Sequence, residues 1–402
     1  MKYVGSLNAD QRNFRLGKHS HRIRSIDLLR GLVMILMALD HTRDFFSIVH
    51  FDPLDLSHTT PEYFFTRWIT HFCAPVFVFL SGTSAFLYGQ RVDSKKELSK
   101  YLFTRGLLLV ILELTLVRWG WQFNWNYSYS WVQVIWVLGI SMIILAWLVH
   151  YSIKRIMIFG ISMVILHNLL DGIRATDLGS LGWLWLFLHE EGTITLGSKG
   201  VLWVVYPLIP WIGVMAVGYG LGKVFKKQSH ERKKILLQLG LIITMAFLVI
   251  RGINLYGDPQ PWSLQKNFIF TLMSFLNCEK YPPSLSFLLM TLGPAMILLS
   301  LFENVHGWKK KFLLPYGRTP LLFYLVHVPI IHLLSFLLAL KMGLNTSFQF
   351  NNSDPSTWPA GFGLNLPGIY LVWIAVVLAL YPLCSLYAAI KSRKKSKLLS
   401  YL

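Results

Sequence analysis

The sequence predicts an all-α membrane protein, a polytopic bundle of about ten transmembrane helices with both termini in the cytoplasm. Three observations lead to this prediction. Hydrophobic residues make up 54% of the 402 residues and charged residues only 14%, well below the share typical of soluble domains. Apolar stretches long enough to cross a bilayer recur along the chain. Lys and Arg are concentrated in alternate loops, as expected for a chain that weaves through a membrane.

The predicted spans and the positive charges alternate along the chain. The ten spans cover residues 26–48, 69–89, 101–118, 131–149, 154–171, 201–222, 235–254, 284–303, 319–341 and 366–390. The segments 1–25, 90–105, 150–156, 223–234, 304–318 and 390–402 hold 28 of the 38 Lys and Arg residues. The alternate loops 119–130 and 344–365 hold none. Because positively charged loops stay cytoplasmic, the net charge of +19 is a topology signal, and no nucleic-acid partner is expected.

We predict one membrane domain at residues 23–392, between basic cytoplasmic tails at 1–22 and 393–402. The three cysteines, at 73, 278 and 384, have no metal-binding or redox spacing and are interpreted as packing residues. The expected location is the plasma (inner) membrane, with the lipid bilayer as a partner. The sequence leaves open whether the chain forms a homodimer.

The first span carries charges at both ends. Asp27 and Arg30 lie one turn apart and are predicted to pair near the cytoplasmic surface. His41 lies 14 residues beyond Asp27, so about 21 Å along the helix and towards the far side of the membrane. Asp40 and Asp44 could orient its imidazole. Two interpretations stay open, a general base and a histidine hydrogen-bonded at the outer interface.

The second span brings more ionisable groups to the same side. Arg67 and His71 share one helical face near the outer edge. Gly82 and its small neighbours predict a close helix crossing. His58 lies in the outer loop before this span. A metal site among these histidines is a minor alternative because no zinc-like spacing occurs, and no metal is expected.

The outer segments near the sixth and eighth spans supply candidate acceptor-binding residues. Trp211 follows two prolines that predict a bent helix lining a cavity. Lys280 is one of few cations on the outer side and could contact an anionic group, and Tyr281 follows it. Aromatic residues in these loops indicate either a platform for a sugar or an ordinary interfacial belt.

Further ionisable and polar residues lie in or next to the third, fifth and ninth predicted spans. Tyr324 and His327 lie one turn apart inside the ninth span, and a histidine there usually faces the bundle interior. Glu113 in the third span is expected to pair with an arginine. His167, Asp171 and His189 near the fifth span are weaker signals.

Five motifs together resemble a known family. They are RSIDLLRG at 24–31, PVFVFLSG at 75–82, YPLIPWIGVMAVGYGLG at 206–222, KYPPSL at 280–285 and YGRTPLLFYLVH at 316–327. They resemble bacterial membrane proteins related to heparan-α-glucosaminide N-acetyltransferase and, more distantly, the acyltransferase type three membrane family. The resemblance implies transfer of an acyl group from cytoplasmic acyl-CoA to an extracytoplasmic amine or hydroxyl.

The resemblance also suggests residue roles. His41 matches the position of the catalytic histidine in the type three family, whereas the human lysosomal relative has its active histidine in the following outer loop, where His58 is the nearest candidate. His71 stands where that relative has an acid. A heparan substrate is not expected, because the chain has no large luminal domain.

The predicted function is therefore a transmembrane acyltransferase that uses acetyl-CoA, or another acyl-CoA, and a glycan-type acceptor; the alternative is a transporter or flippase of small or lipid-linked molecules. The catalytic candidates are His41, His58, Asp44, His71 and Arg67, with Arg67 or His71 stabilising the oxyanion. The candidates for binding acyl-CoA are Asp27, Arg30, Arg318, Tyr324 and His327. Those for binding the acceptor are Lys280, Tyr281 and Trp211.

Overall fold

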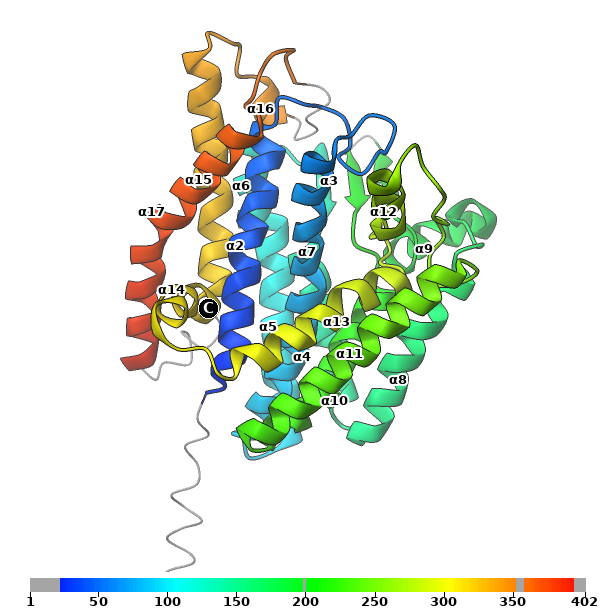
Figure 1. The fold of residues 1–402 in the computed structure, drawn as a ribbon. Helices are drawn as coiled ribbons and strands as arrows, with labels where there is room; N and C mark the ends of the chain where they lie inside the picture. Colours follow the sequence, from blue (N-terminus) through cyan, green and yellow to red (C-terminus); the bar gives the residue numbers. More distant parts are fainter. Residues whose placement is uncertain (1–21, 198–199, 352–357, 394–402) are drawn as a thin grey trace, which may run out of the picture.

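The computed structural model describes residues 22–197, 200–351 and 358–393, most of which form a bundle of helices (Figure 1). The helices are α2 (Arg24–Phe46), α3 (Pro61–Trp68), η1 (Ile69–Phe72), α4 (Cys73–Gly89), α5 (Lys95–Leu112), η2 (Glu113–Val117), α6 (Arg118–Gln122), α7 (Val134–Leu148), α8 (Ile153–Leu166), η3 (His167–Leu170), η4 (Ala175–Leu181), α9 (Gly182–Leu188), α10 (Ile209–Leu221), η6 (Gly222–Lys226), α11 (Ser229–Ile253), α12 (Phe268–Leu276), α13 (Leu285–Phe302), α14 (Gly307–Arg318), α15 (Pro320–Lys341), α16 (Phe348–Asn351) and α17 (Leu366–Arg393).

Six helical stretches in the described part of the chain are long and apolar enough to cross a membrane. They are Pro61–Gly89, Ile153–Leu170, Ser229–Ile253, Leu285–Phe302, Pro320–Lys341 and Leu366–Arg393. Each of the other four predicted spans also contains a helix, but α2 and α5 carry several charges, and α7 and α10 are short. The helical membrane fold is thus supported, while the count of ten spans stays a prediction.

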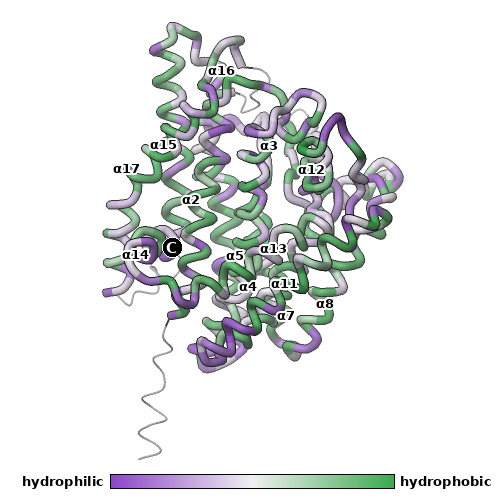
Figure 2. The backbone as a smooth tube through the Cα atoms, in the orientation of Figure 1, coloured by the Kyte–Doolittle hydropathy of each residue, from purple (hydrophilic) through white to green (hydrophobic). Residues whose placement is uncertain are grey.

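The surface of the bundle suits lipid. Leu241, Ile242 and Met245 on α11 are each more than half exposed, and α8 exposes Ile158 and Leu166 in the same way. Figure 2 shows hydrophilic residues gathered mainly at the two ends of the bundle, with hydrophobic residues between them. Such a band would be costly in water and is expected of helices that face a hydrocarbon core.

The two ends of the bundle differ, and we name them by their contents. The basic end holds the start of α2, the end of α17 and the Lys- and Arg-rich loops. The loop end holds the longer connections 47–60, 171–197, 200–208, 254–284, 342–351 and 358–365. The α2 helix lies in the centre, where it packs against α4, α13, α14, α15 and α17.

Glycines bring two helix pairs into backbone contact. A Cβ atom added at Gly31 would lie 2.2 Å from the carbonyl oxygen of Leu313. A Cβ atom added at Gly317 would lie 1.7 Å from the carbonyl oxygen of Asp27. The helices α2 and α14 therefore cross without room for a side chain at either glycine. The predicted crossing at Gly82 is confirmed, since a Cβ there would lie 2.0 Å from the Met215 carbonyl oxygen on α10.

Three short strands depart from the all-α prediction. Strands β1 (Tyr129–Val132), β2 (Gly192–Thr195) and β3 (Val201–Val204) form a sheet in the order β1-β3-β2, with β3 parallel to β1 and antiparallel to β2. The span predicted from residue 201 was therefore wrong at its start, because the helix begins only at Ile209. A four-residue apolar run before a proline can pair as a strand as readily as it can begin a helix.

Candidate active site

His41, half-buried on α2, forms a pair with the fully buried His327 on α15. Nδ1 of His41 lies 2.8 Å from Nε2 of His327, and the two rings stack with centroids 5.0 Å apart. Nδ1 of His327 lies 2.8 Å from the carbonyl oxygen of Phe323, to which it must donate. His327 Nε2 is then an acceptor when the ring is neutral, so His41 donates from Nδ1. This leaves the lone pair of His41 on Nε2, the atom that a general base would use.

Two aromatic side chains surround His41. Trp121 on α6 makes an edge contact with its ring at 4.9 Å between centroids, and Tyr324 on α15 makes another at 6.1 Å. The Trp121 indole N–H and the Tyr324 hydroxyl are both buried and interact with each other, and neither makes a well-formed hydrogen bond to another described residue. Buried donors of this kind are uncommon in folded proteins and often belong to functional sites.

Of the two carboxylates expected to orient His41, Asp40 instead holds α2 against α3 and Asp44 pairs within α2. Both oxygens of Asp40 lie 2.6 Å from Nη1 of Arg67, and Asp40 also accepts from Thr70. Asp44 lies 2.5 Å from Nη2 of Arg43, its neighbour in sequence. Adjacent residues on a helix point about 100° apart, so Asp40 faces Arg67 while His41 faces α15. The structure therefore gives His327, and neither aspartate, as the partner of His41.

The other histidine candidates lie in different surroundings. His71 on η1 is fully buried against Phe287, and neither ring nitrogen has a partner in the described structure. His58 lies on an exposed loop, where its Nδ1 is 2.6 Å from Asp55. Hydrogen bonds from Ser57, and then from His58, lower the pKa of Asp55 to about 2. The described contacts of His58 are thus local, and none of them reaches His41.

The candidate acceptor-binding residues form an aromatic group at the loop end. The Lys280 ammonium lies 4.9 Å from the ring centroid of Tyr281, and Tyr281 makes an edge contact with Tyr206 at 5.1 Å. Trp211 is fully buried behind Tyr206. Lys280 is itself buried and close enough to His71 to interact with it electrostatically. This group and the second span therefore belong to one region.

A cavity of about 380 Å³ opens at the basic end. Its polar lining includes Asp27 and six cationic side chains, Arg22, Arg30, Arg91, Arg105, Arg318 and Lys391. Deeper in the bundle it is lined by Met34, Leu138, Met142 and Tyr324, among other residues. Met34 lies seven residues before His41, so about 10 Å below it on the same helix face. The cavity thus leads from the basic end towards the histidine pair.

Asp27 is the counter-ion of several of these arginines. It accepts two hydrogen bonds from Arg22, at 2.6 and 2.9 Å, and lies 3.7 Å from Arg30, which confirms the predicted pair. Arg318 approaches it at 3.9 Å, because the glycine crossing brings α14 against α2. The sequence-predicted residues Asp27, Arg30 and Arg318 therefore lie together at the cavity mouth.

The expected pairing of Glu113 with an arginine was wrong. Glu113 begins the π-helix η2 and accepts from the backbone N–H of Gln133 at 3.0 Å, and the backbone N–H groups of Ile135 and Trp136 also interact with its carboxylate. Arg118 instead binds the connection that follows it, including the Ser130 hydroxyl at 3.0 Å and the Asn124 carbonyl oxygen at 2.9 Å. Arginine has five donors, so a loop rich in carbonyl groups can satisfy it better than one carboxylate.

Sequence reasoning missed other residues of this site. Trp121 was not singled out from the sequence, although it touches His41. Arg105 lay inside a predicted span, where a cation often marks a cavity or a polar pathway, and this could have identified it. Lys391 gave no signal, because its place at the cavity depends on how α17 packs.

Comparison with known families agrees with this arrangement. The profile of the catalytic domain of heparan-alpha-glucosaminide N-acetyltransferase matches residues 22–254, more than half of the chain. The chain belongs to this family. Membership indicates a membrane acetyltransferase. No curated protein matches the chain. His41 lies inside the matched segment, whereas its partner His327 lies beyond it.

Proposed function

We propose that the protein transfers an acetyl group from acetyl-CoA, bound from the cytoplasm at the basic end, to an amine or hydroxyl of a glycan-type acceptor at the loop end. The observation that carries the proposal is the cavity that leads from a cationic mouth towards the His41–His327 pair. A transporter would need a polar pathway continuing through the bundle. The cavity instead becomes apolar towards Met34 and Tyr324.

The cavity lining suits the parts of acetyl-CoA in order. The arginines around Asp27 can neutralise phosphate groups, which arginine binds with paired N–H donors. Tyr88 and Tyr101 stack with their centroids 3.9 Å apart at the same mouth and offer aromatic surface for a base. The apolar wall beyond them suits a pantetheine arm. The thioester would then lie beside Tyr324.

His41 is proposed as the general base. Its Nε2 takes the proton of the acceptor amine or hydroxyl as that group attacks the thioester carbonyl. The new bond forms between the acceptor atom and the carbonyl carbon. The C–S bond then breaks, and the proton on His41 passes to the leaving sulfur of CoA. In this direct route His327 holds His41 in the required tautomer through its lone pair on Nε2.

The Trp121 N–H and the Tyr324 O–H are proposed as the donors that stabilise the oxyanion. Both are buried, interact with each other and touch the His41 ring. Preorganised donors of this kind give the largest stabilisation where charge develops in a dry site. They replace Arg67 in this role, because Arg67 is held by Asp40. They also replace His71, which lies against Phe287.

The acceptor is proposed to bind beside Lys280 and Tyr281. An amphipathic aromatic ring beside a cation is a common surface for a sugar that carries polar groups. In this arrangement Asp40 and Arg67 hold α2 in position next to the acceptor. The positive-inside distribution supports a cytoplasmic basic end in the plasma membrane.

A transfer assay in proteoliposomes tests the proposal. Purified protein is incubated with radiolabelled acetyl-CoA and amino-sugar oligosaccharides or cell-envelope glycans. We expect labelled acceptor with the wild type and a loss of about 10²–10⁴-fold with His41→Asn, at unchanged acetyl-CoA binding. His230→Ala, which changes an exposed histidine on α11, is the matched control and should equal the wild type. Passage of unmodified glycan without acetyl-CoA binding would establish the transporter instead.

A further inference from the structure

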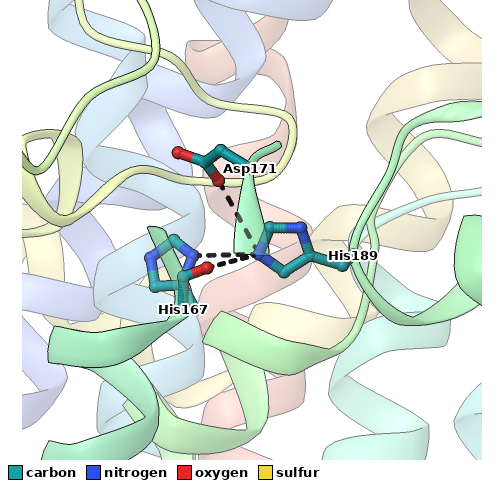
Figure 3. A group of neighbouring side chains, drawn as sticks. All are labelled: His167, Asp171 and His189. Carbon is teal, nitrogen blue, oxygen red and sulfur yellow. Dashed lines mark hydrogen bonds and ion pairs between the residues drawn. The ribbon is translucent and has the colours of Figure 1, made fainter. Parts of the chain in front are cut away.

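A second group of histidines lies at the loop end and takes no part in lining the cavity. Figure 3 shows how its side chains face one another. It consists of His167 at the start of η3, Asp171 just after η3, and His189 just after α9. Nδ1 of His167 lies 3.4 Å from Nε2 of His189, and Oδ1 of Asp171 lies 3.8 Å from that same nitrogen. One donor atom from each residue lies within 4.8 Å of the other two. We call these three residues the His–His–Asp cluster.

Three acceptors in the cluster approach Nε2 of His189, which carries at most one proton and cannot donate to all of them. The carbonyl oxygen of His167 is 2.9 Å from Nε2 of His189, and both Nδ1 of His167 and the Asp171 carboxylate face the same nitrogen. If Nε2 of His189 donates to the carbonyl, the His167 nitrogen and the carboxylate are left without that proton. A cation would interact favourably with all three side chains at once.

The spacing of the donor atoms fits a tetrahedral metal ion. Zinc binds imidazole nitrogen at about 2.0–2.1 Å, so two nitrogens of a tetrahedral site lie about 3.4 Å apart. The two histidine nitrogens are 3.4 Å apart. Two imidazoles and one carboxylate favour zinc and its neighbours over magnesium or calcium, which prefer oxygen ligands.

The surroundings of the cluster resemble those of a metal site. His167 and His189 are only 2% and 3% exposed, whereas the Asp171 side chain is 22% exposed, which leaves one side open for water as a fourth ligand. The other oxygen of Asp171 accepts from the amide of Asn168 at 2.8 Å, and Trp185 stacks on His189. Such outer contacts fix the orientation of ligands. Nε2 of His167 is buried with no partner in the described chain, so the only hydrogen-bonding contact of this ring is with His189.

We propose that His167, Asp171 and His189 bind a divalent transition-metal ion of the zinc type, which fastens the segment 172–188 to the end of α8. The first two ligands precede this segment and the third follows it. Asn168, beside the cluster, also accepts from the backbone N–H of Leu285 at the start of α13. The metal therefore stabilises the loop end next to Lys280 and Tyr281. This role does not depend on the proposed acetyl transfer, and no metal was expected from the sequence.

Metal content measured on the intact chain tests the proposal. Protein purified without a histidine tag is stripped with chelator, titrated with Zn²⁺ in detergent or nanodiscs, and measured by elemental analysis and thermal unfolding. We expect one Zn²⁺ per chain, a higher Tm on loading and reversal by chelator. His189→Gln and Asp171→Asn should each lose the bound ion and the Tm response while remaining monodisperse.

His58→Ala is the matched control, because His58 and Asp55 form another His–Asp pair at the same end. It should keep both the stoichiometry and the Tm response. Loading the wild type with Co²⁺ gives a readout that needs no variant, since a tetrahedral site has strong visible absorption. A wild type that binds substoichiometric Zn²⁺, or that binds it as well after His189→Gln, would overturn the proposal.

Discussion

The two histidine pairs of this molecule have similar contacts and different surroundings. His41 and His327 come from α2 and α15, 286 residues apart, and meet inside the bundle. His167 and His189 are 22 residues apart and meet at the loop end. The first pair is backed by a backbone carbonyl and flanked by two buried donors, whereas the second is accompanied by a carboxylate.

This difference shows how surroundings decide the chemistry of an imidazole. In the first pair each N–H has one acceptor, so the chain of hydrogen bonds ends in a free lone pair on His41, as general-base catalysis requires. In the second pair several acceptors compete for one proton, which favours a cation. Variants that disturb the neighbours of one pair at a time test whether the first pair acts as a base and the second binds a cation.

The largest structural effect is expected from Arg67→Ala. The change removes the closest partner of the Asp40 carboxylate, while Arg43 at 3.1 Å and Thr70 remain, so the expected cost is that of a hydrogen bond to a charged group, about 1.5–3 kcal/mol. We expect a large drop in unfolding stability in nanodiscs, together with lost transfer, because α2 is no longer fixed to α3. The Zn²⁺ stoichiometry should persist in the protein that remains folded.

Lys227→Ala is the control, since its ion pair with Glu231 at 3.1 Å is exposed and such pairs contribute little to stability. If Arg67→Ala were no more destabilising than this variant, the ion pair would not be what holds the His41 helix in place.

The sequence predicted the parts of the first site better than their pairing. The central helix, the inward-facing His327 and the arginines of the basic end follow from apolar length, charge and the cost of ionisable groups in a bilayer. The partner of His41 depends on how α2 crosses α15, and no local pattern encodes that crossing. Asp40 and Asp44 were therefore the nearest candidates along the chain, and neither was the correct partner.

The same limit explains the other errors. The strand Val201–Val204 is too short to be distinguished from the start of a helix, and its pairing with β1 is set by residues about 70 positions earlier. Glu113 was expected to pair with an arginine because opposite charges attract, but backbone groups bind both Glu113 and Arg118 instead. His167 and His189 became a candidate site only when the segment between them was seen to fold back.

A smaller effect is expected from removing the support of His41. His327→Leu keeps an apolar side chain but loses the acceptor for Nδ1 of His41, so one hydrogen bond of about 0.5–1.5 kcal/mol is lost. We expect kcat to fall about two- to tenfold at unchanged KM for acetyl-CoA. His327→Gln offers an amide oxygen as acceptor and should recover part of the rate. Equal kcat in both variants and the wild type would show that His327 does not position the base.

The smallest effect is expected at the exposed pair Asp55–His58. Disturbing this pair tests whether the loop histidine His58 takes part in acetyl transfer. Hydrogen bonds from Ser57 and His58 hold the pKa of Asp55 at about 2, below its ordinary value of 3.8. The stabilisation is therefore present above the ordinary value and is lost as the pH falls from about 4 to about 2. Amide exchange in residues 52–59, corrected for intrinsic rates, should accelerate over that range. Asp55→Asn should give the same local loosening at neutral pH while acetyl transfer and metal content match the wild type. If Asp55→Asn reduced transfer as much as His41→Asn does, the base would instead be His58. Only a loop that carries the reacting histidine would make transfer so sensitive to a change at its surface.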